Sequence, residues 1–136
     1  MIHRCFHRVR SYELDGNNHV NNAVYLNYFE YARMEFLKDI GFDYRKFREL
    51  GYSLFVAEIR VKYKEAARVL DDITITTEPE KKRKASGVFR QRVFRGKEEL
   101  CSALVTWACI NADGRPEALP GGFDLEALYP ENGESH

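Results

Sequence analysis

Residues 13–22 read ELDGNNHVNN and lead directly into an apolar-patterned segment, residues 23–40. The ten residues contain an aspartate, a glycine, an imidazole and four carboxamides. A polar, glycine-containing turn followed at once by a long helix aims side chains and free backbone N–H groups at one point. We therefore expect the rest of the chain to form a sheet that holds this turn and this helix.

The segment after the turn has the apolar spacing of a helix. Asn21 or Asn22 suits the N-cap, and Gly41 suits the C-terminal stop. A helix of about 18 residues is ~27 Å long. Its apolar side chains are largely aromatic, so we expect it to lie in a deep trough rather than on the surface. The residues at helical spacing are Tyr25, Tyr28, Phe29, Ala32, Phe36, Leu37 and Ile40.

Beyond the helix the apolar period changes to two, which predicts strands. Together with a first strand ahead of the polar turn, this order predicts an α+β fold in one domain over residues 1–136, a long helix wrapped by an antiparallel sheet of about five strands. A short second helix is expected over 42–50, a charged connection over 79–85, and another short helix over 124–129 capped by Asp124. Residues 131–136 are expected to be a disordered tail. The strands are expected at 3–11, 53–64, 73–78, 87–95 and 100–110.

The last expected strand, residues 100–110, is largely apolar at both parities. One helix cannot cover both faces of a sheet, so the second face of this strand needs another subunit. The sequence therefore predicts a homo-oligomer.

Composition excludes several classes of protein. The chain is 44% hydrophobic and 31% charged with a net charge of zero, as in soluble globular proteins, so neither nucleic acid nor a membrane is an expected partner. No segment approaches the ~20 apolar residues of a membrane span, and no signal peptide is visible. Three cysteines without a Cys-x-x-Cys pair favour the reducing cytoplasm, and we expect neither a metal nor a cofactor.

The polar turn offers the parts of acyl-transfer chemistry. Asp15, Asn17 and His19 supply a carboxylate, a carboxamide and an imidazole at alternate positions, and the helix start can hold a developing oxyanion. Each residue type also has a structural alternative. An aspartate before glycine is often a turn residue, a histidine at a helix entry often a cap or packing residue, and Asn21 and Asn22 suit capping.

The pattern from Asp15 to Asn22, followed by Tyr25 and Phe29-Glu30, resembles the motif of hotdog-fold thioesterases. It is most similar to the branch with the plant acyl-ACP thioesterases and small bacterial acyl-CoA thioesterases, and more loosely to the 4-hydroxybenzoyl-CoA thioesterases. The resemblance spans roughly residues 4–120. It implies a long helix wrapped by a sheet, homodimers or dimers of dimers with active sites between subunits, and hydrolysis of thioesters of coenzyme A or acyl carrier protein.

The resemblance also implies roles for individual residues. Asp15 matches the catalytic carboxylate, and Asn17 and His19 match its partners in the plant branch. Backbone N–H groups near Asn21, Asn22 and Ala23 match the oxyanion-binding helix start. Two departures stand out: many small members have aspartate where this chain has glutamate at position 13, and the Tyr-His pair that some bacterial relatives carry at the helix start is absent.

Substrate binding is expected from basic and aromatic side chains. The basic run that contains Lys82, Arg83 and Lys84 is either a solvated hairpin or a clamp for the phosphates of a coenzyme or for an acidic carrier protein. Arg60 and Lys62, with Lys64, can add to such a clamp from the polar face of their strand. Tyr25 belongs to an aromatic stripe that is mostly core, but its edge can line an acyl channel.

Two mechanisms fit Asp15. The carboxylate attacks the thioester carbonyl to form an anhydride, or it acts as a general base on water, with or without His19. The main rival function is a non-catalytic acyl-CoA-binding domain. A hotdog hydratase or dehydratase needs a histidine facing a carboxylate in a different motif, which the sequence lacks.

Overall fold

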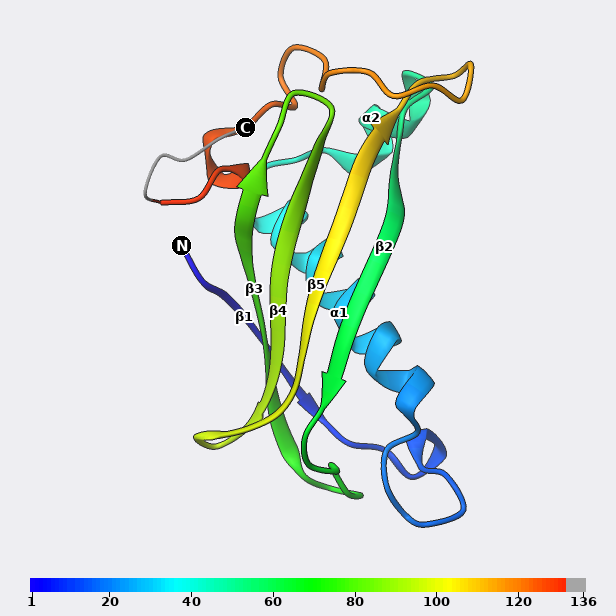
Figure 1. The fold of residues 1–136 in the computed structure, drawn as a ribbon, viewed down its shortest axis with the longest axis vertical. Coiled ribbons are helices and arrows are strands. Elements are labelled where there is room, and N and C mark those ends of the chain that lie inside the picture. The colour runs from blue at the N-terminus through cyan, green and yellow to red at the C-terminus, as the bar shows by residue number, and fades with distance from the viewer. Residues whose placement is uncertain (132–136) are drawn as a thin grey trace.

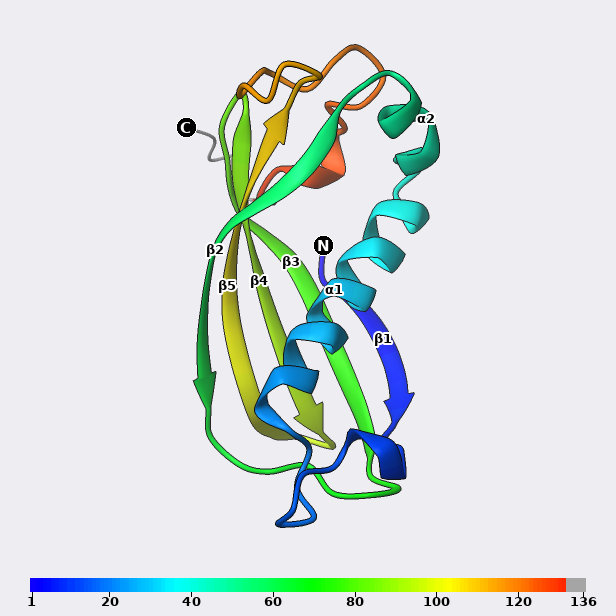
Figure 2. The same cartoon turned by 90° about the vertical axis from the view of Figure 1, so that its right-hand side faces the viewer.

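The computed structural model describes residues 1–131; the expected tail lies almost entirely outside this range. A long helix, α1 (Asn22–Asp39), lies across one face of a five-stranded antiparallel sheet (Figures 1 and 2). The strands are β1 (His3–Arg8), β2 (Ser53–Tyr63), β3 (Asp72–Lys82), β4 (Ser86–Arg95) and β5 (Glu98–Ile110), in the spatial order β1-β3-β4-β5-β2. The fold also contains a short helix, α2 (Tyr44–Glu49), and two 3₁₀ turns, η1 (Ser11–Glu13) and η2 (Glu126–Leu128).

Helix α1 confirms the expectation from the apolar spacing. The Asn21 side chain caps it by accepting a hydrogen bond from the Ala23 N–H at 2.9 Å. Gly41 follows its end with φ of +86°, a left-handed conformation that glycine adopts without steric cost. The buried side chains of α1 face the sheet and form the centre of the core: Tyr25, Tyr28, Phe29, Ala32, Phe36 and Leu37.

A buried polar contact holds α1 on the sheet. Gln91 of β4 has no exposed surface, and its side-chain amide donates to the Phe29 carbonyl and to the Thr77 hydroxyl, each at 2.9 Å. Its Oε1 accepts a hydrogen bond from Arg33 of α1 at 2.9 Å. A buried amide whose donors and acceptor are all used fixes the position of the helix, because any slip would leave one of these groups unpaired.

Strand β3 is longer than the sequence predicted. The expected connection at 79–85 is strand as far as Lys82, because β3 continues past a register shift between Pro79 and Lys81 and pairs again with Val88 and Gly87 of β4. Proline has no N–H to donate, and a bulge tolerates it. Two other expectations are also wrong. β1 ends at residue 8 rather than 11, and the helix near the C-terminus shrinks to η2, whose cap is not Asp124.

The two faces of the sheet differ in burial. The β5 side chains on the α1 side are buried, whereas those on the other face, such as Leu104 and Thr106, are half-buried in the single chain. β2 is an edge strand that pairs only with β5 among the described strands, and its Phe55 is 60% exposed. No helix within residues 1–131 is long and apolar enough to cross a membrane.

Candidate active site

The segment between β1 and α1 folds into a tight loop over residues 14–20. Leu14 and Val20 form an antiparallel bridge at its base. Above this bridge the Asp15 N–H donates to the His19 carbonyl at 2.8 Å, and the Asn18 N–H donates to the Asp15 carbonyl at 3.1 Å. Asn18 closes the turn with φ of +62°, a conformation that asparagine tolerates better than most residues. The loop therefore presents Asp15 beside the start of α1.

One oxygen of the Asp15 carboxylate is held by the loop itself. Oδ1 accepts hydrogen bonds from the backbone N–H groups of Asn17 at 2.8 Å and His19 at 3.3 Å. No hydrogen bond to Oδ2 occurs within residues 1–131. Asn17 and His19 thus contact Asp15 through their main chain, and no hydrogen bond from either side chain to Asp15 occurs within residues 1–131. The result is a half-buried carboxylate with one fixed oxygen and one available oxygen.

A cavity of about 270 Å³ opens beside this carboxylate. It lies between the loop, the first turn of α1 and the residues at the end of β2. His19 contributes to its wall, whereas Asn17 does not. The lining residues are Asp15, His19, Val20, Asn22, Tyr25, Tyr63, Lys64, Glu65 and Ala66.

The backbone N–H groups at the start of α1 are not equivalent. The Asn21 N–H donates to the Glu13 carbonyl at 2.9 Å, and the Ala23 N–H is used by the Asn21 cap. The Asn22 N–H has no acceptor among the described residues, and Asn22 lines the cavity. An N-terminal N–H of an 18-residue helix carries the partial positive charge of the helix dipole. Of the three N–H groups expected near the oxyanion, those of Asn21 and Ala23 are therefore already bonded, and that of Asn22 has no acceptor within residues 1–131.

Two tyrosines shape the cavity. Tyr25 is 2% exposed, its hydroxyl accepts a hydrogen bond from the Ala67 N–H at 3.1 Å, and burial raises its pKa. Tyr63 stacks edge-on against Tyr25 with ring centroids 5.5 Å apart, and its hydroxyl donates to the Asn22 carbonyl at 2.9 Å. Sequence reasoning assigned Tyr63 to a strand but not to the site. Alternation along the strand could have indicated this position, because Tyr63 lies on the same side of β2 as Ile59, and that side faces α1.

Of the basic residues expected to bind substrate, Lys64 lines this cavity, whereas the others do not within one chain. Arg60 and Lys62 pair in register with Leu104 and Ser102, on the sheet face opposite α1. Arg83 and Lys84 are exposed in the β3–β4 turn, at the end of the molecule opposite the Asp15 loop (Figure 1). Strand β3, 11 residues long, separates the two ends by ~36 Å.

Lys82 differs most from its expected place in a solvated hairpin. Its side chain has no exposed surface. Its ammonium donates to the Arg83 carbonyl and lies 3.6 Å from a carboxylate oxygen of Asp124. It also lies 5.7 Å and 5.0 Å from the ring centroids of Trp107 and Tyr129. Lys82 is therefore a core residue that holds the C-terminal segment on the sheet, and its assignment to a coenzyme clamp is wrong.

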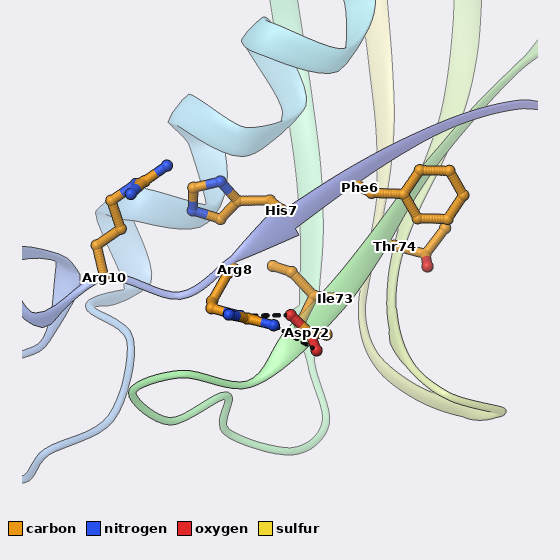
Figure 3. Close-up of a pocket in the computed structure, with 7 residues that line it drawn as sticks. All are labelled: Phe6, His7, Arg8, Arg10, Asp72, Ile73 and Thr74. Atoms are coloured by element: carbon orange, nitrogen blue, oxygen red, sulfur yellow. Dashed lines mark hydrogen bonds and ion pairs between the residues drawn. The ribbon is translucent and has the colours of Figure 1, made fainter.

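A larger hollow, of about 550 Å³, is lined by residues of β1 and of the start of β3 (Figure 3). Its charged side chains are largely committed to each other: Arg8 donates to Asp72 at 2.8 and 3.3 Å. Figure 3 shows that Phe6 and Arg8 extend away from His7, which points toward α1. This surface lacks the combination of a free carboxylate oxygen and a free helix N–H that the Asp15 cavity provides.

The cysteines do not offer a second nucleophile. All three are buried and free, at positions 5, 101 and 109. Burial raises the pKa of Cys101 to about 12 and also raises the pKa of Cys5 and Cys109, so the reactive thiolate is disfavoured at neutral pH. Within residues 1–131 no cluster of three metal-ligating side chains occurs.

The chain is similar in sequence to known thioesterases. Residues 9–128 match the family model described as the thioesterase-like superfamily. The chain is 32% identical over 107 residues to the long-chain acyl-CoA thioesterase FadM of Escherichia coli. The aligned region covers 76% of this chain and 80% of FadM. It is 34% identical over 93 residues to the chloroplastic acyl-acyl carrier protein thioesterase ATL3 of Arabidopsis thaliana, covering 68% of this chain but only 46% of that protein.

The fold has solved counterparts. The crystal structure of a probable thioesterase from Bartonella henselae superimposes with a TM-score of 0.84 at 28% identity, covering 88% of this chain and all of that chain. The long helix across a five-stranded antiparallel sheet is thus the hotdog fold predicted from the sequence. By its fold and by the match over residues 9–128, the chain belongs to the thioesterase-like superfamily.

Proposed function

We propose that the protein hydrolyses acyl-CoA thioesters, releasing a free carboxylic acid and coenzyme A, with Asp15 as the reacting carboxylate. One observation carries the proposal: Asp15, with one available oxygen, and Asn22, with a free helix N–H, line the same cavity. A thioester carbonyl needs both, an attacking or base-activating group on its carbon and a donor for its oxygen. FadM, a long-chain acyl-CoA thioesterase by name, supports the substrate class.

The two possible reactions differ in where oxygen from water enters. In the first, Asp15 Oδ2 attacks the carbonyl carbon, the C–S bond breaks with release of the thiolate, and water then hydrolyses the acyl-aspartyl anhydride. In the second, Asp15 takes a proton from water as that water attacks the carbonyl carbon, the C–S bond breaks, and the proton passes from Asp15 to the departing sulfur, which leaves as the thiol. A single turnover in ¹⁸O-labelled water distinguishes them, because label in the Asp15 carboxylate appears only by the anhydride route.

Supporting roles follow from the positions of the neighbouring residues. His19 lines the cavity, which supports a role in supplying the departing thiolate with a proton or in orienting water. Asn17 acts through its backbone N–H, which fixes Asp15 Oδ1. The Asn22 N–H holds the oxyanion, aided by the hydrogen bond from Tyr63 to the Asn22 carbonyl.

We further propose that the active unit is a homodimer or a dimer of dimers. Exposed apolar side chains on the edge strand, including Phe55 and Tyr63, and the half-buried outer face of β5 leave apolar surface for a second copy. If a coenzyme's phosphates are bound by Arg60, Lys62, Arg83 or Lys84, the acyl group of that coenzyme then lies in the cavity of another copy. Light scattering combined with size-exclusion chromatography tests this; a monomer at micromolar concentration would contradict it.

The function itself is tested with a panel of acyl-CoA thioesters of different chain length, benzoyl-type thioesters and acyl carrier protein thioesters, with thiol release as the readout. We expect turnover of at least one class and none of the matched oxygen esters. An acyl-CoA-binding domain without catalysis would bind members of the panel and release no thiol, and its binding would be unaffected by Asp15→Asn. The three free, buried cysteines are compatible with the reducing cytoplasm as the place of action.

A further inference from the structure

Behind the Asp15 loop lies a second carboxylate, Glu13, that the reaction does not use. Its side chain is 12% exposed and accepts hydrogen bonds from three elements. The Tyr28 hydroxyl of α1 donates to Oε1 at 2.9 Å, and the Arg10 N–H donates to the same oxygen at 2.8 Å. His7 Nε2 of β1 lies 3.0 and 3.1 Å from the two carboxylate oxygens. Glu13 therefore ties the edge strand to the helix.

The same residue anchors the catalytic loop through its main chain. The Glu13 carbonyl accepts the Asn21 N–H at 2.9 Å, and the next pair along is the Leu14–Val20 bridge. Glu13 and Asn21 thus form the pair just outside the base of the loop. Asp15 follows two residues after Glu13, and α1 begins one residue after Asn21. A shift of Glu13 is transmitted to both Asp15 and the Asn22 N–H.

The chemistry around Glu13 favours a charged, fixed side chain. Burial alone would raise its pKa, but the hydrogen bonds from Arg10, His7 and Tyr28 outweigh burial and lower it. A buried carboxylate that accepts charge-assisted hydrogen bonds is held more rigidly than a neutral group. The His7 ring also packs on Tyr28 with centroids 5.0 Å apart, and Figure 3 shows His7 directed toward α1.

We infer that Glu13 is a positioning residue for this site: it sets the distance between the Asp15 carboxylate and the free N–H of Asn22. Glu13 does not line the cavity, so it acts on the reaction through the loop and not through the substrate. The inference rests on the proposed function for its kinetic consequence. Misplacement of a reacting group by about 1 Å can lower the rate by about a hundredfold without weakening binding.

The test compares Glu13→Gln with Glu117→Gln. Glu117 also accepts a tyrosine hydroxyl, from Tyr52 at 2.6 Å, and is not part of the Asp15 loop; because it is exposed, it controls for loss of a tyrosine–carboxylate contact at the surface. We expect Glu13→Gln to lower kcat by about 10–100-fold with KM within about twofold, and Glu117→Gln to change neither. In an Asp15→Asn background, Glu13→Gln should have no further effect on the residual rate. If Glu13→Gln keeps kcat within about twofold of wild type, or mainly raises KM, the inference is overturned.

A second measurement needs no activity. The backbone N–H groups of Asn17 and His19 are bonded to Asp15, so their hydrogen exchange reports the order of the loop. Glu13→Gln should accelerate both by about tenfold or more and leave the core strands unchanged, whereas unchanged exchange overturns the inference. Should Glu13→Gln fail to fold, Tyr28→Phe removes one donor only, and the same readouts apply. An inactive wild type would refute the proposed function, while the exchange result would still decide the role of Glu13.

Discussion

Truncation of Lys82 distinguishes two hypotheses for this residue, a buried lysine that stabilises the core and a lysine that binds the phosphates of a coenzyme. Its side chain is fully buried between Trp107 and Tyr129 and is bonded to a backbone carbonyl. Lys82→Ala removes two cation–π contacts worth about 0.5–2 kcal/mol each and leaves a cavity where the stem packed. The desolvation cost of the buried ammonium offsets part of that loss. We expect a net destabilisation of about 2–4 kcal/mol, in the range of large-to-small core substitutions.

Urea denaturation and thermal melting measure this effect. At about 3 °C per kcal/mol, Lys82→Ala should lower Tm by about 6–12 °C. Lys84→Ala, an exposed neighbour, should stay within about 0.5 kcal/mol of wild type. The KM of the folded Lys82→Ala protein for a full coenzyme thioester should equal that of wild type. The reasoning is refuted if this variant melts with wild type and its KM rises for the full thioester but not for an analogue that lacks the nucleotide.

The remaining predictions concern packing, pH and capping. A Cβ on Gly87 would lie 2.6 Å from Trp107 Cζ2, so Gly87→Ala should destabilise by about 1–3 kcal/mol, whereas Gly121→Ala, which meets nothing within 4 Å, should be neutral in the same urea titration. The pKa of Glu13 lies below its ordinary 4.5, so its ionised form stabilises the fold above that pH and the contribution is lost as pH falls through the folded pKa. The stability gap between wild type and Glu13→Gln should therefore narrow on acidification; a gap that widens would contradict the hydrogen bonding described. Asn21→Ala removes the cap of α1 and should cost about 1 kcal/mol, most of which Asn21→Ser should restore.

Local patterns in the sequence predicted much of the fold. The apolar spacing and the flanking Asn21 and Gly41 determine α1 almost to the residue, because capping and helical periodicity are local properties. The length of β3 was not predictable in the same way. Its extension beyond Pro79 depends on pairing with β4 across a bulge, and a run of charged residues gives no sign of such pairing.

The candidate site rests on a residue that the sequence singles out, and the structure adds contacts that the sequence does not show. The motif points to Asp15, but the contacts that hold it come from backbone N–H groups, which every residue type except proline carries and which a sequence pattern therefore does not reveal. The burial of Lys82 was missed for a different reason. Its partners Trp107 and Tyr129 are distant in sequence and meet only in the folded chain.

The most direct test of whether this carboxylate carries the reaction is the turnover of Asp15→Asn. The affinity of the same variant is measured alongside, for a non-hydrolysable thioether analogue of a substrate that the wild type hydrolyses. The substitution keeps the size of the side chain and leaves the Asn22 N–H in place. We predict that kcat falls by about 10²–10⁴-fold or more while the Kd of the analogue stays within about threefold, since ground-state binding does not depend on the reacting carboxylate. Turnover within tenfold of wild type would show that another group performs the chemistry.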